Sequence, residues 1–517
     1  MNGKVYTLNH KKPTAQAVAT FDEKIVYVGE NSEASKLVGP KTKVVDLEGK
    51  TVLPGFTDCH VHMAGFGRSF SELNLRNVTS IAELKELIRE ESQQLPVGTW
   101  ILGNGWDQEK LTEKRLPTRW DLDEAAPDNP AVLFRVCTHI CAANTKALEK
   151  AEIGRSTVAP LGGEIDKDPS TGEPNGILRE KALELIFQAF PKASVEEIVE
   201  VCLVACRKAI EAGLTGVHWI IESPVEMRVI QKMRREGKLP LRVCLLFPEK
   251  FLENIEGLGL GQGFGDSMVK IGGLKILLDG SLGAQTAALC KPYNDAPGAS
   301  GILTYGQENF ETLVLNAHKV GLQLAVHAIG DKAIDMALKA FEKALQKIPN
   351  SDHRHRIEHT SVLNEELIRR MKSLGVIASV QPHFTVSDFW VEYRLGKKRA
   401  RWVYPFKSLM KAGVVVCGGS DCPVDPISPL LGIWAAVVRQ RNSGECLTVE
   451  EAIRLYTVNA AYANFEENLK GTIEEGKLAD MVVLSDDPFK IKPEKIRDIK
   501  VLMTVVGGQM SVHMGTI

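Results

Sequence analysis

The 517-residue sequence lacks the features that mark nucleic-acid-binding, disordered and membrane-spanning proteins. Its 63 Lys and Arg residues nearly balance its 65 Asp and Glu residues, and the formal net charge is −2. It has no long basic run of the kind that displaces counterions from phosphates. It also has no low-complexity tract, and no stretch approaches the roughly 20 uninterrupted apolar residues that a membrane-spanning helix needs. We therefore expect a folded protein that binds neither nucleic acid nor a membrane.

The sequence also lacks a secretory signal and a cysteine framework. The first residues, MNGKVYTLNHKK, do not contain the apolar core of a signal peptide. The ten cysteines are scattered and include no CxxC pair, which argues against a disulfide scaffold or a structural zinc finger. We expect reduced, mostly buried cysteines and a cytoplasmic location.

Both ends of the chain have the pattern of short strands. Residues 1–53 and about 470–517 contain β-branched runs punctuated by glycine, such as KIVYVGE and VLMTVVGGQM. Each segment alone is too short to bury a core. We therefore predict that the two ends combine into one small β-sandwich and that residues 54–469 form the main domain.

The middle of the chain alternates short apolar runs with amphipathic helical patterns, which are clearest at 195–213, 331–348 and 364–375. Strands that alternate with helices imply right-handed crossovers and a parallel sheet. Eight such units favour a TIM-like (β/α)8 barrel, an α/β fold. A doubly wound open sheet is the alternative architecture, although no GxGxxG follows an early strand. The candidate strands are 51–60, 214–220, 241–247, 269–279, 322–328, 355–360, 376–382 and 414–421.

The first two candidate strands are separated by about 150 residues, too many for a simple crossover. This stretch has strand and helix patterns of its own. We predict that residues from about 66 to 180 form an inserted subdomain over the mouth of the barrel.

Residues that can bind metal or move protons stand at the ends of the candidate strands. His60 and His62 alternate along the first strand, so both side chains can face one metal ion. Any one of these residues alone is more often structural, but functional groups of a barrel gather where its strands end. The joint pattern therefore predicts a metal site at the barrel mouth. Its other members are Lys275, His327, His359 and Asp421.

Several motifs resemble the metal-dependent amidohydrolase superfamily, and more narrowly its amidohydrolase 3 branch of YtcJ-like and N-substituted formamide deformylase-like proteins. The similarity extends over essentially the whole chain, including both terminal β segments. The motifs are VLPGFTDCHVHM, KILLDGSLGAQTAAL, AVHAIGD, RIEHT, GGSDCPV and GKLADMVVLSDDP.

The resemblance implies a ligand set for one or two divalent metal ions. His60 and His62 would bind the more buried ion, and His327 and His359 would bind the second. Lys275 would carry a carbamate formed with CO2 and bridge the two ions. Lys270, the competing lysine, lies farther from the DGS motif. Zinc suits this histidine-rich set, although manganese, iron or nickel could also serve with an oxygen bridge.

The resemblance also implies hydrolysis of an amide-type C–N bond in a small molecule. Asp421 would contact the metal and act as the catalytic base towards the attacking water. Further residues are expected to line the substrate pocket, among them Arg135 and His139 in the segment FRVCTH. The main substrate-binding candidates are Trp106, His218, Gln381 and His383.

Two other functions remain open. Deaminases of this superfamily usually place a Glu shortly after the histidine of the fifth strand, whereas His327 is followed by AIGD. A non-catalytic barrel scaffold would be expected to lose metal ligands, and all six expected ligand residues are present here. Barrels of this type often form dimers, so a homodimer is compatible with the sequence.

Overall fold

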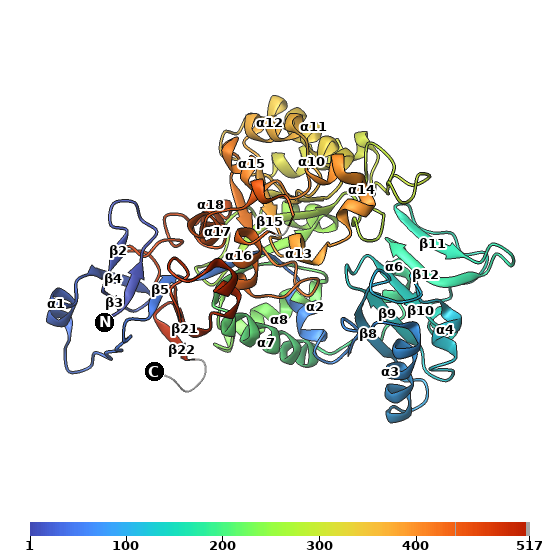
Figure 1. Ribbon diagram of the computed structural model, residues 1–517, viewed down its shortest axis with the longest axis horizontal. Coiled ribbons are helices and arrows are strands. Elements are labelled where there is room, and N and C mark those ends of the chain that lie inside the picture. Colours follow the sequence, from blue (N-terminus) through green and yellow to red (C-terminus); the bar gives the residue numbers. More distant parts are fainter. Residues whose placement is uncertain (440, 513–517) are drawn as a thin grey trace.

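The computed structural model describes residues 1–439 and 441–512. A central barrel lies between two β-rich units (Figure 1). One unit is built from both ends of the chain, and the other is an insertion after the first barrel strand. The expected fold class, a TIM-like barrel with an inserted subdomain and a terminal β domain, is confirmed.

The barrel is a single sheet of eight strands in which every pair of neighbours runs parallel. Ser420 N donates to the Asp58 carboxylate at 3.0 Å and Asp421 N donates to His60 O at 2.8 Å, so the chain after the last strand meets the first strand. These bonds bring the sheet close to closure. The strands are β6 (Phe56–Val61), β13 (Leu214–Ile220), β14 (Arg242–Pro248), β15 (Val269–Leu277), β16 (Leu324–Ala328), β17 (Arg356–His359), β18 (Ile377–Val380) and β19 (Val416–Gly418).

Helices surround the strands and bury their apolar faces against them. Local signals set their ends: Ser194 and Glu197 form a capping box at the start of α7, and Gly375 ends α12 with φ 70°. All three helices expected from periodicity are present. The main barrel helices are α7 (Val195–Glu211), α8 (Pro224–Arg235), α9 (Leu252–Gly257), α10 (Gln307–Lys319), α11 (Asp331–Lys347), α12 (Glu365–Leu374), α15 (Phe406–Lys411) and α17 (Val449–Leu455).

The predicted strand 51–60 is wrong as a single element, because it is two strands in two different sheets. β5 (Thr51–Pro54) belongs to the terminal sheet, and β6 begins the barrel at Phe56. Gly55 joins them, and a Cβ there would lie 2.2 Å from Cγ2 of Thr215. Only glycine lets the backbone pass this close to β13.

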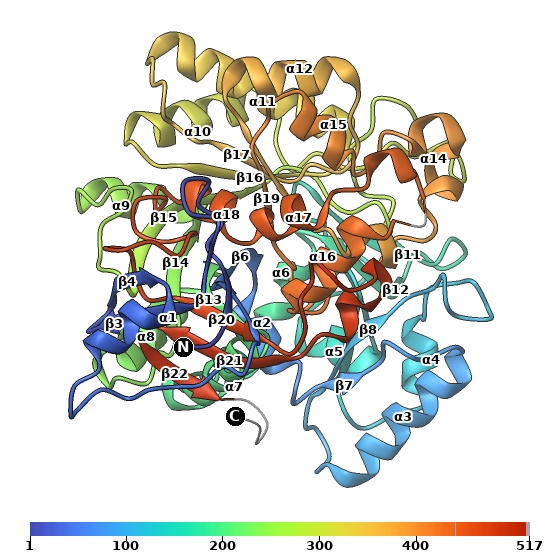
Figure 2. The ribbon, with the colours of Figure 1, turned by 60° about the vertical axis from the view of Figure 1, so that its left-hand side comes forward.

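The terminal unit joins strands from both ends of the chain. Figures 1 and 2 both show the last described strand, Gln509–Val512, close to the N-terminus in this unit. Its six-stranded sheet has the order β2-β1-β5-β20-β21-β22, and the hairpin β3–β4 forms a second, smaller layer. Residues 513–517 of the predicted terminal segment lie outside the described residues. The strands are β1 (Lys4–Tyr6), β2 (Thr14–Ala15), β3 (Ala17–Phe21), β4 (Lys24–Gly29), β20 (Met481–Leu484), β21 (Val501–Val506) and β22 (Gln509–Val512).

The insertion forms a second six-stranded sheet, in the order β11-β12-β10-β9-β8-β7, on the side of the barrel away from the terminal unit (Figure 1). Its own apolar cluster includes Leu84, Trp106 and Leu133. The elements are β7 (Leu73–Asn74), α3 (Ile81–Gln94), β8 (Ile101–Trp106), α4 (Arg119–Asp123), β9 (Ala131–Arg135), β10 (Ile140–Ala143), α5 (Thr145–Lys150), β11 (Gly163–Lys167), β12 (Pro174–Glu180) and α6 (Leu183–Phe187).

The ten cysteines are free, and eight of them are buried, as expected for reduced side chains in a packed core. Across residues 1–439 and 441–512, no helix is both long enough and apolar enough to cross a membrane.

Candidate metal centre

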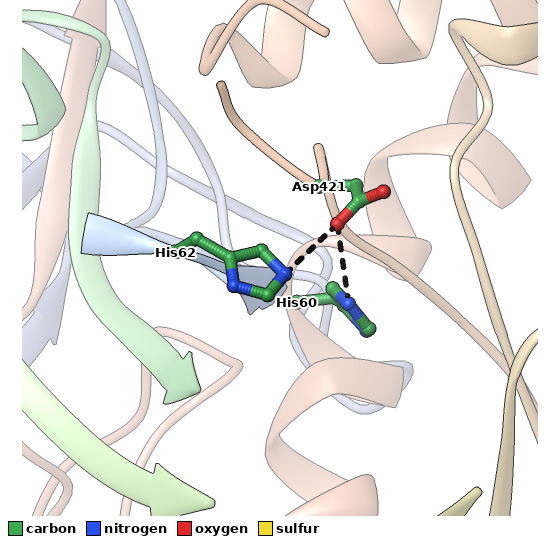
Figure 3. A group of neighbouring side chains, drawn as sticks. All are labelled: His60, His62 and Asp421. Carbon is green, nitrogen blue, oxygen red and sulfur yellow. Dashed lines mark ion pairs between the residues drawn. The ribbon is translucent and has the colours of Figure 1, made fainter. Parts of the chain in front are cut away.

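Three of the predicted ligands meet at the barrel mouth. His60 comes from β6, His62 follows that strand directly, and Asp421 follows β19. Figure 3 shows both imidazoles directed at the same oxygen of Asp421. Nε2 of His60 lies 3.2 Å from Asp421 Oδ1, and Nε2 of His62 lies 3.3 Å from it. One potential ligand atom from each side chain lies within 4.8 Å of the others, an arrangement that can hold one metal ion.

The other nitrogen of each imidazole is anchored by a carboxylate. Nδ1 of His60 bonds to Glu358, and Nδ1 of His62 lies 3.1 Å from Glu222 Oε1. Arg356 in turn donates to Glu358. Metal-binding histidines are typically oriented in this way, because the outer bond fixes the tautomer and leaves the inner nitrogen free to coordinate. Nε2 of His60 is buried and has no hydrogen-bond partner in the described part of the chain, so the donor set fits a cation.

His327 and His359 lie beside these ligands. The ring centroid of His359 is 4.8 Å from that of His60 and 4.4 Å from that of His327. Nδ1 of His359 bonds to Gln381 Oε1 at 2.7 Å, and Nε2 of His327 lies 3.2 Å from the Gly280 carbonyl. Each ring therefore has one nitrogen anchored on the far side, as His60 and His62 do.

Burial and neighbouring charges set the protonation states of these groups. Desolvation lowers the pKa of His359 to about 3 and holds the pKa of His327 well below its usual range. Both rings are therefore neutral, the form that coordinates metals. Burial alone would raise the pKa of Asp421, but the imidazoles of His60, His62 and His359 outweigh it, and the pKa lies well below the usual range. Asp421 is thus an ionised carboxylate.

Lys275 is buried on β15 with only 9% of its surface exposed. Among the described residues, its amine has no hydrogen-bond or ion-pair partner. Desolvation lowers the pKa of this amine. An unpaired ammonium is unfavourable in such a place, and the shift favours the neutral amine. Lys270, in contrast, forms an ion pair with Glu466 at 3.1 Å.

A cavity of about 390 Å³ opens over His327, His359 and Asp421. The barrel loops and the insertion share its wall. The insertion contributes several polar groups, including His139, whose ring centroid is 5.3 Å from that of His327 and whose Nδ1 bonds to Glu180 Oε2 at 2.7 Å. The other insertion residues in the wall include Arg76, Asp107, Lys110, Arg135, Val136 and Cys137.

The substrate-binding candidates occupy different places. His383 lines the cavity, and its Nδ1 lies 3.0 Å from Asp425 Oδ2. Gln381 instead anchors His359 from behind. Trp106 is fully buried in the core of the insertion, where its indole donates to Leu133 O at 2.9 Å. His218 lies inside the barrel with its Nδ1 2.7 Å from Nη1 of Arg356, and it is not a cavity-lining residue.

The residues that anchor the histidines were missed at the sequence level. Glu358 and Arg356 stand two apart on β17, so both side chains point into the barrel interior rather than to the helices. A charged pair of this spacing inside an apolar strand is the signal that could have found them. Glu222 follows β13 and has no comparable signal.

The parallel barrel with imidazoles and a carboxylate gathered at its mouth defines a TIM-like barrel protein with a candidate metal centre. The chain belongs to the amidohydrolase family, whose profile matches residues 43–512. It is 37% identical to "Putative amidohydrolase YtcJ" of Bacillus subtilis (strain 168), with 98% of each chain covered. It is 30% identical to "N-substituted formamide deformylase" of Arthrobacter pascens, with 98% of this chain and 97% of the relative covered. An uncharacterized metal-dependent hydrolase from Pyrococcus horikoshii has a similar crystal structure, with 33% identity, a TM-score of 0.79 and coverage of 95% and 98%.

Proposed function

We propose that the protein is a metal-dependent hydrolase that cleaves an amide-type C–N bond of a small molecule. The convergence of His60, His62 and Asp421, each imidazole anchored on its far side by a carboxylate, carries this proposal. A bound divalent ion, for which zinc best suits these donors, supplies Lewis acidity that lowers the pKa of water towards about 7 and polarises a carbonyl. The deformylase relative supports the choice of a C–N bond through its name.

Asp421 moves the proton in this proposal. Its carboxylate is ionised and lies beside the cavity, so it can accept a proton from the attacking water. It then returns that proton to the departing nitrogen, which leaves as a neutral amine. His60 and His62 hold Asp421 Oδ1 between them and so position this carboxylate.

A second ion would be held by His327, His359 and a carboxylated Lys275. The neutral amine of Lys275 attacks the carbon of CO2, a new N–C bond forms, and one proton is released to give a carbamate anion. Burial without a partner supports this step, because the modification replaces an unfavourable buried ammonium with an anionic oxygen donor. Burial lowers the pKa of Lys275, which favours the neutral amine that the step requires.

The deaminase alternative gains no support from the residues after His327. Asp331, which ends the segment AIGD, begins α11, and its carboxylate accepts a hydrogen bond from Cys290 N at 2.8 Å. It thus holds a loop in place and is not a cavity-lining residue.

A substrate panel tests the proposed function. The metal-loaded protein is assayed with N-formyl amines, N-acetyl amines, a cyclic amide and an ester. We expect hydrolysis of at least one amide class and its loss in Asp421→Asn, whereas Asp486→Asn, an exposed control, keeps the wild-type rate. Hydrolysis of none of the amides, or full activity of Asp421→Asn, would overturn the proposal.

A further inference from the structure

A second cavity of about 690 Å³ adjoins the metal-site cavity. It lies between the insertion, the loop after β15 and α14 (Val391–Ala400). The two cavities share Gly283, Phe389 and Trp390 in their walls. They therefore meet at one short boundary that is built from the barrel and faces the insertion.

Gly283 lines both cavities at this boundary and is closely packed. A Cβ at this position would lie 2.8 Å from Nη1 of Arg135 and 2.9 Å from Cζ2 of Trp390. The Gly283 carbonyl is fixed from both sides, because Arg394 donates to it at 3.1 Å and Gln108 at 3.4 Å. The absence of a side chain thus lets Arg135 and Trp390 pack directly against the Gly283 backbone, and a side chain there would have to displace one of them.

The second cavity has an aromatic wall. Phe389 is 42% exposed and Tyr393 is 62% exposed, although both carry large aromatic rings. Trp390 is held by Arg394, whose guanidinium carbon lies 5.5 Å from the indole ring centroid. Exposed rings beside a held indole form a surface on which a flat apolar group can stack.

The charges that line this cavity are almost all paired within the protein. Arg394 bonds to both Glu109 and Asp295. Arg115 pairs with Asp121 at 2.7 Å and Arg179 pairs with Asp166 at 2.8 Å. The exception is Lys114, whose amine donates to the backbone carbonyl of Glu109. A ligand group that enters this cavity therefore meets rings and compensated charges, which favours an uncharged group over an ion.

We propose that the two cavities form one continuous substrate cleft, in which the second cavity binds an uncharged aromatic group distant from the scissile bond. This inference rests on the proposed function for the reaction, but it concerns which substrates are preferred. The aromatic group can belong to the amine part or to the acyl part, since both parts diverge from the scissile bond over the metal site.

The test compares matched substrates in two arms. In the amine arm, N-acetyl-ω-phenylalkylamines of several chain lengths are compared with N-acetylalkylamines of the same length. In the acyl arm, N-methyl-ω-phenylalkanamides are compared with N-methylalkanamides. We expect kcat/KM to be roughly tenfold higher for the phenyl compound in one arm, about what stacking and burial of one ring provide.

Two variants examine the cleft itself. Gly283→Ala forces Arg135 or Trp390 to move at the boundary, and Tyr393→Ala removes an exposed ring from the second cavity alone. Both should bring the phenyl-to-alkyl ratio of kcat/KM close to one. Gly298→Ala is the matched control, because a Cβ there meets no atom within 4 Å. A ratio near one in wild-type protein, or a wild-type ratio that persists in both variants, would overturn the inference.

Direct binding separates this inference from the proposed function. Calorimetry with ω-phenylalkylamines and ω-phenylalkanoates should show tighter binding than with the alkyl analogues, and the difference should shrink in both variants. If no amide is hydrolysed but this pattern of binding is observed, the proposed function fails and the cleft stands. If amides are hydrolysed without any phenyl preference, the cleft alone fails.

Discussion

Low pH should destabilise the barrel through a row of three buried, hydrogen-bonded histidines, His318, His353 and His355, which lie far from the metal centre. His355 precedes β17, and its Nδ1 accepts a hydrogen bond from Leu324 N at 3.1 Å. Its Nε2 lies 2.9 Å from Nδ1 of His318, and its backbone N–H donates to Nδ1 of His353 at 2.8 Å. The outer nitrogens of His318 and His353 face backbone carbonyls. Neutral rings satisfy all of these hydrogen bonds. An added proton on Nδ1 of His355 would instead point at the backbone N–H of Leu324, which is also a donor.

The size of the effect follows from the difference between the folded and unfolded pKa of His355. Burial holds the folded pKa well below the usual range, whereas the unfolded value is about 6.5. The unfolded chain therefore binds more protons, so the stabilisation is complete above pH 6.5 and is lost as pH falls. At pH 5, proton binding by the unfolded chain lowers the free energy of unfolding by about 2 kcal/mol through this one residue.

Urea unfolding at pH 8 and pH 5 measures this effect. His355→Asn loses hydrogen bonds at both pH values, but the decrease in unfolding free energy between them should be about 2 kcal/mol smaller than in wild-type protein. His10→Asn changes an exposed histidine that is not part of this row, and it should keep the wild-type decrease in unfolding free energy. An unchanged decrease in His355→Asn would refute the reasoning, since it would mean that His355 is protonated equally in both states.

Two further predictions concern the metal centre. Lys275→Ala should lose activity, and short carboxylic acids should restore part of it by supplying the missing anionic oxygens. Steady-state assays with added formate or acetate measure this rescue. Full activity of the variant with two bound metals would contradict the bridging role. Glu358→Gln should weaken metal affinity about 10- to 100-fold, because Nδ1 of His60 loses its carboxylate partner. Competition with a chromogenic chelator measures this loss, with the exposed Glu33→Gln as control, and equal affinities in the two variants would count against anchoring by Glu358.

Much of the fold could be predicted because local patterns and long-range packing agree. The apolar runs of the barrel strands and the periodicity of α7, α11 and α12 report burial directly. The break at Gly55 was missed because the residues on either side are apolar, although the dipeptide Pro54-Gly55 is a turn signal. The pairing of β5 with the terminal sheet and of β6 with β13 separates the two strands.

The ligand positions could be expected from strand ends, whereas their surroundings depend on contacts between distant segments. His218 was expected at the pocket, but it is the fifth residue of β13 and points into the barrel towards Arg356. His139 reaches the cavity because β10 pairs with β12, which also places Glu180 against its ring. No spacing in the sequence reports that pairing.

The number of bound metal ions in the His60→Ala/His62→Ala double variant tests the central claim most directly. Wild-type and variant proteins are loaded with zinc, desalted and compared by elemental analysis, with circular dichroism as the check on folding and His10→Ala as the matched control. The variant should lose at least one equivalent of metal and all activity while remaining folded, because the ligands lie at the barrel mouth, where the strands end. An unchanged metal stoichiometry in the folded double variant would contradict the assignment of these histidines.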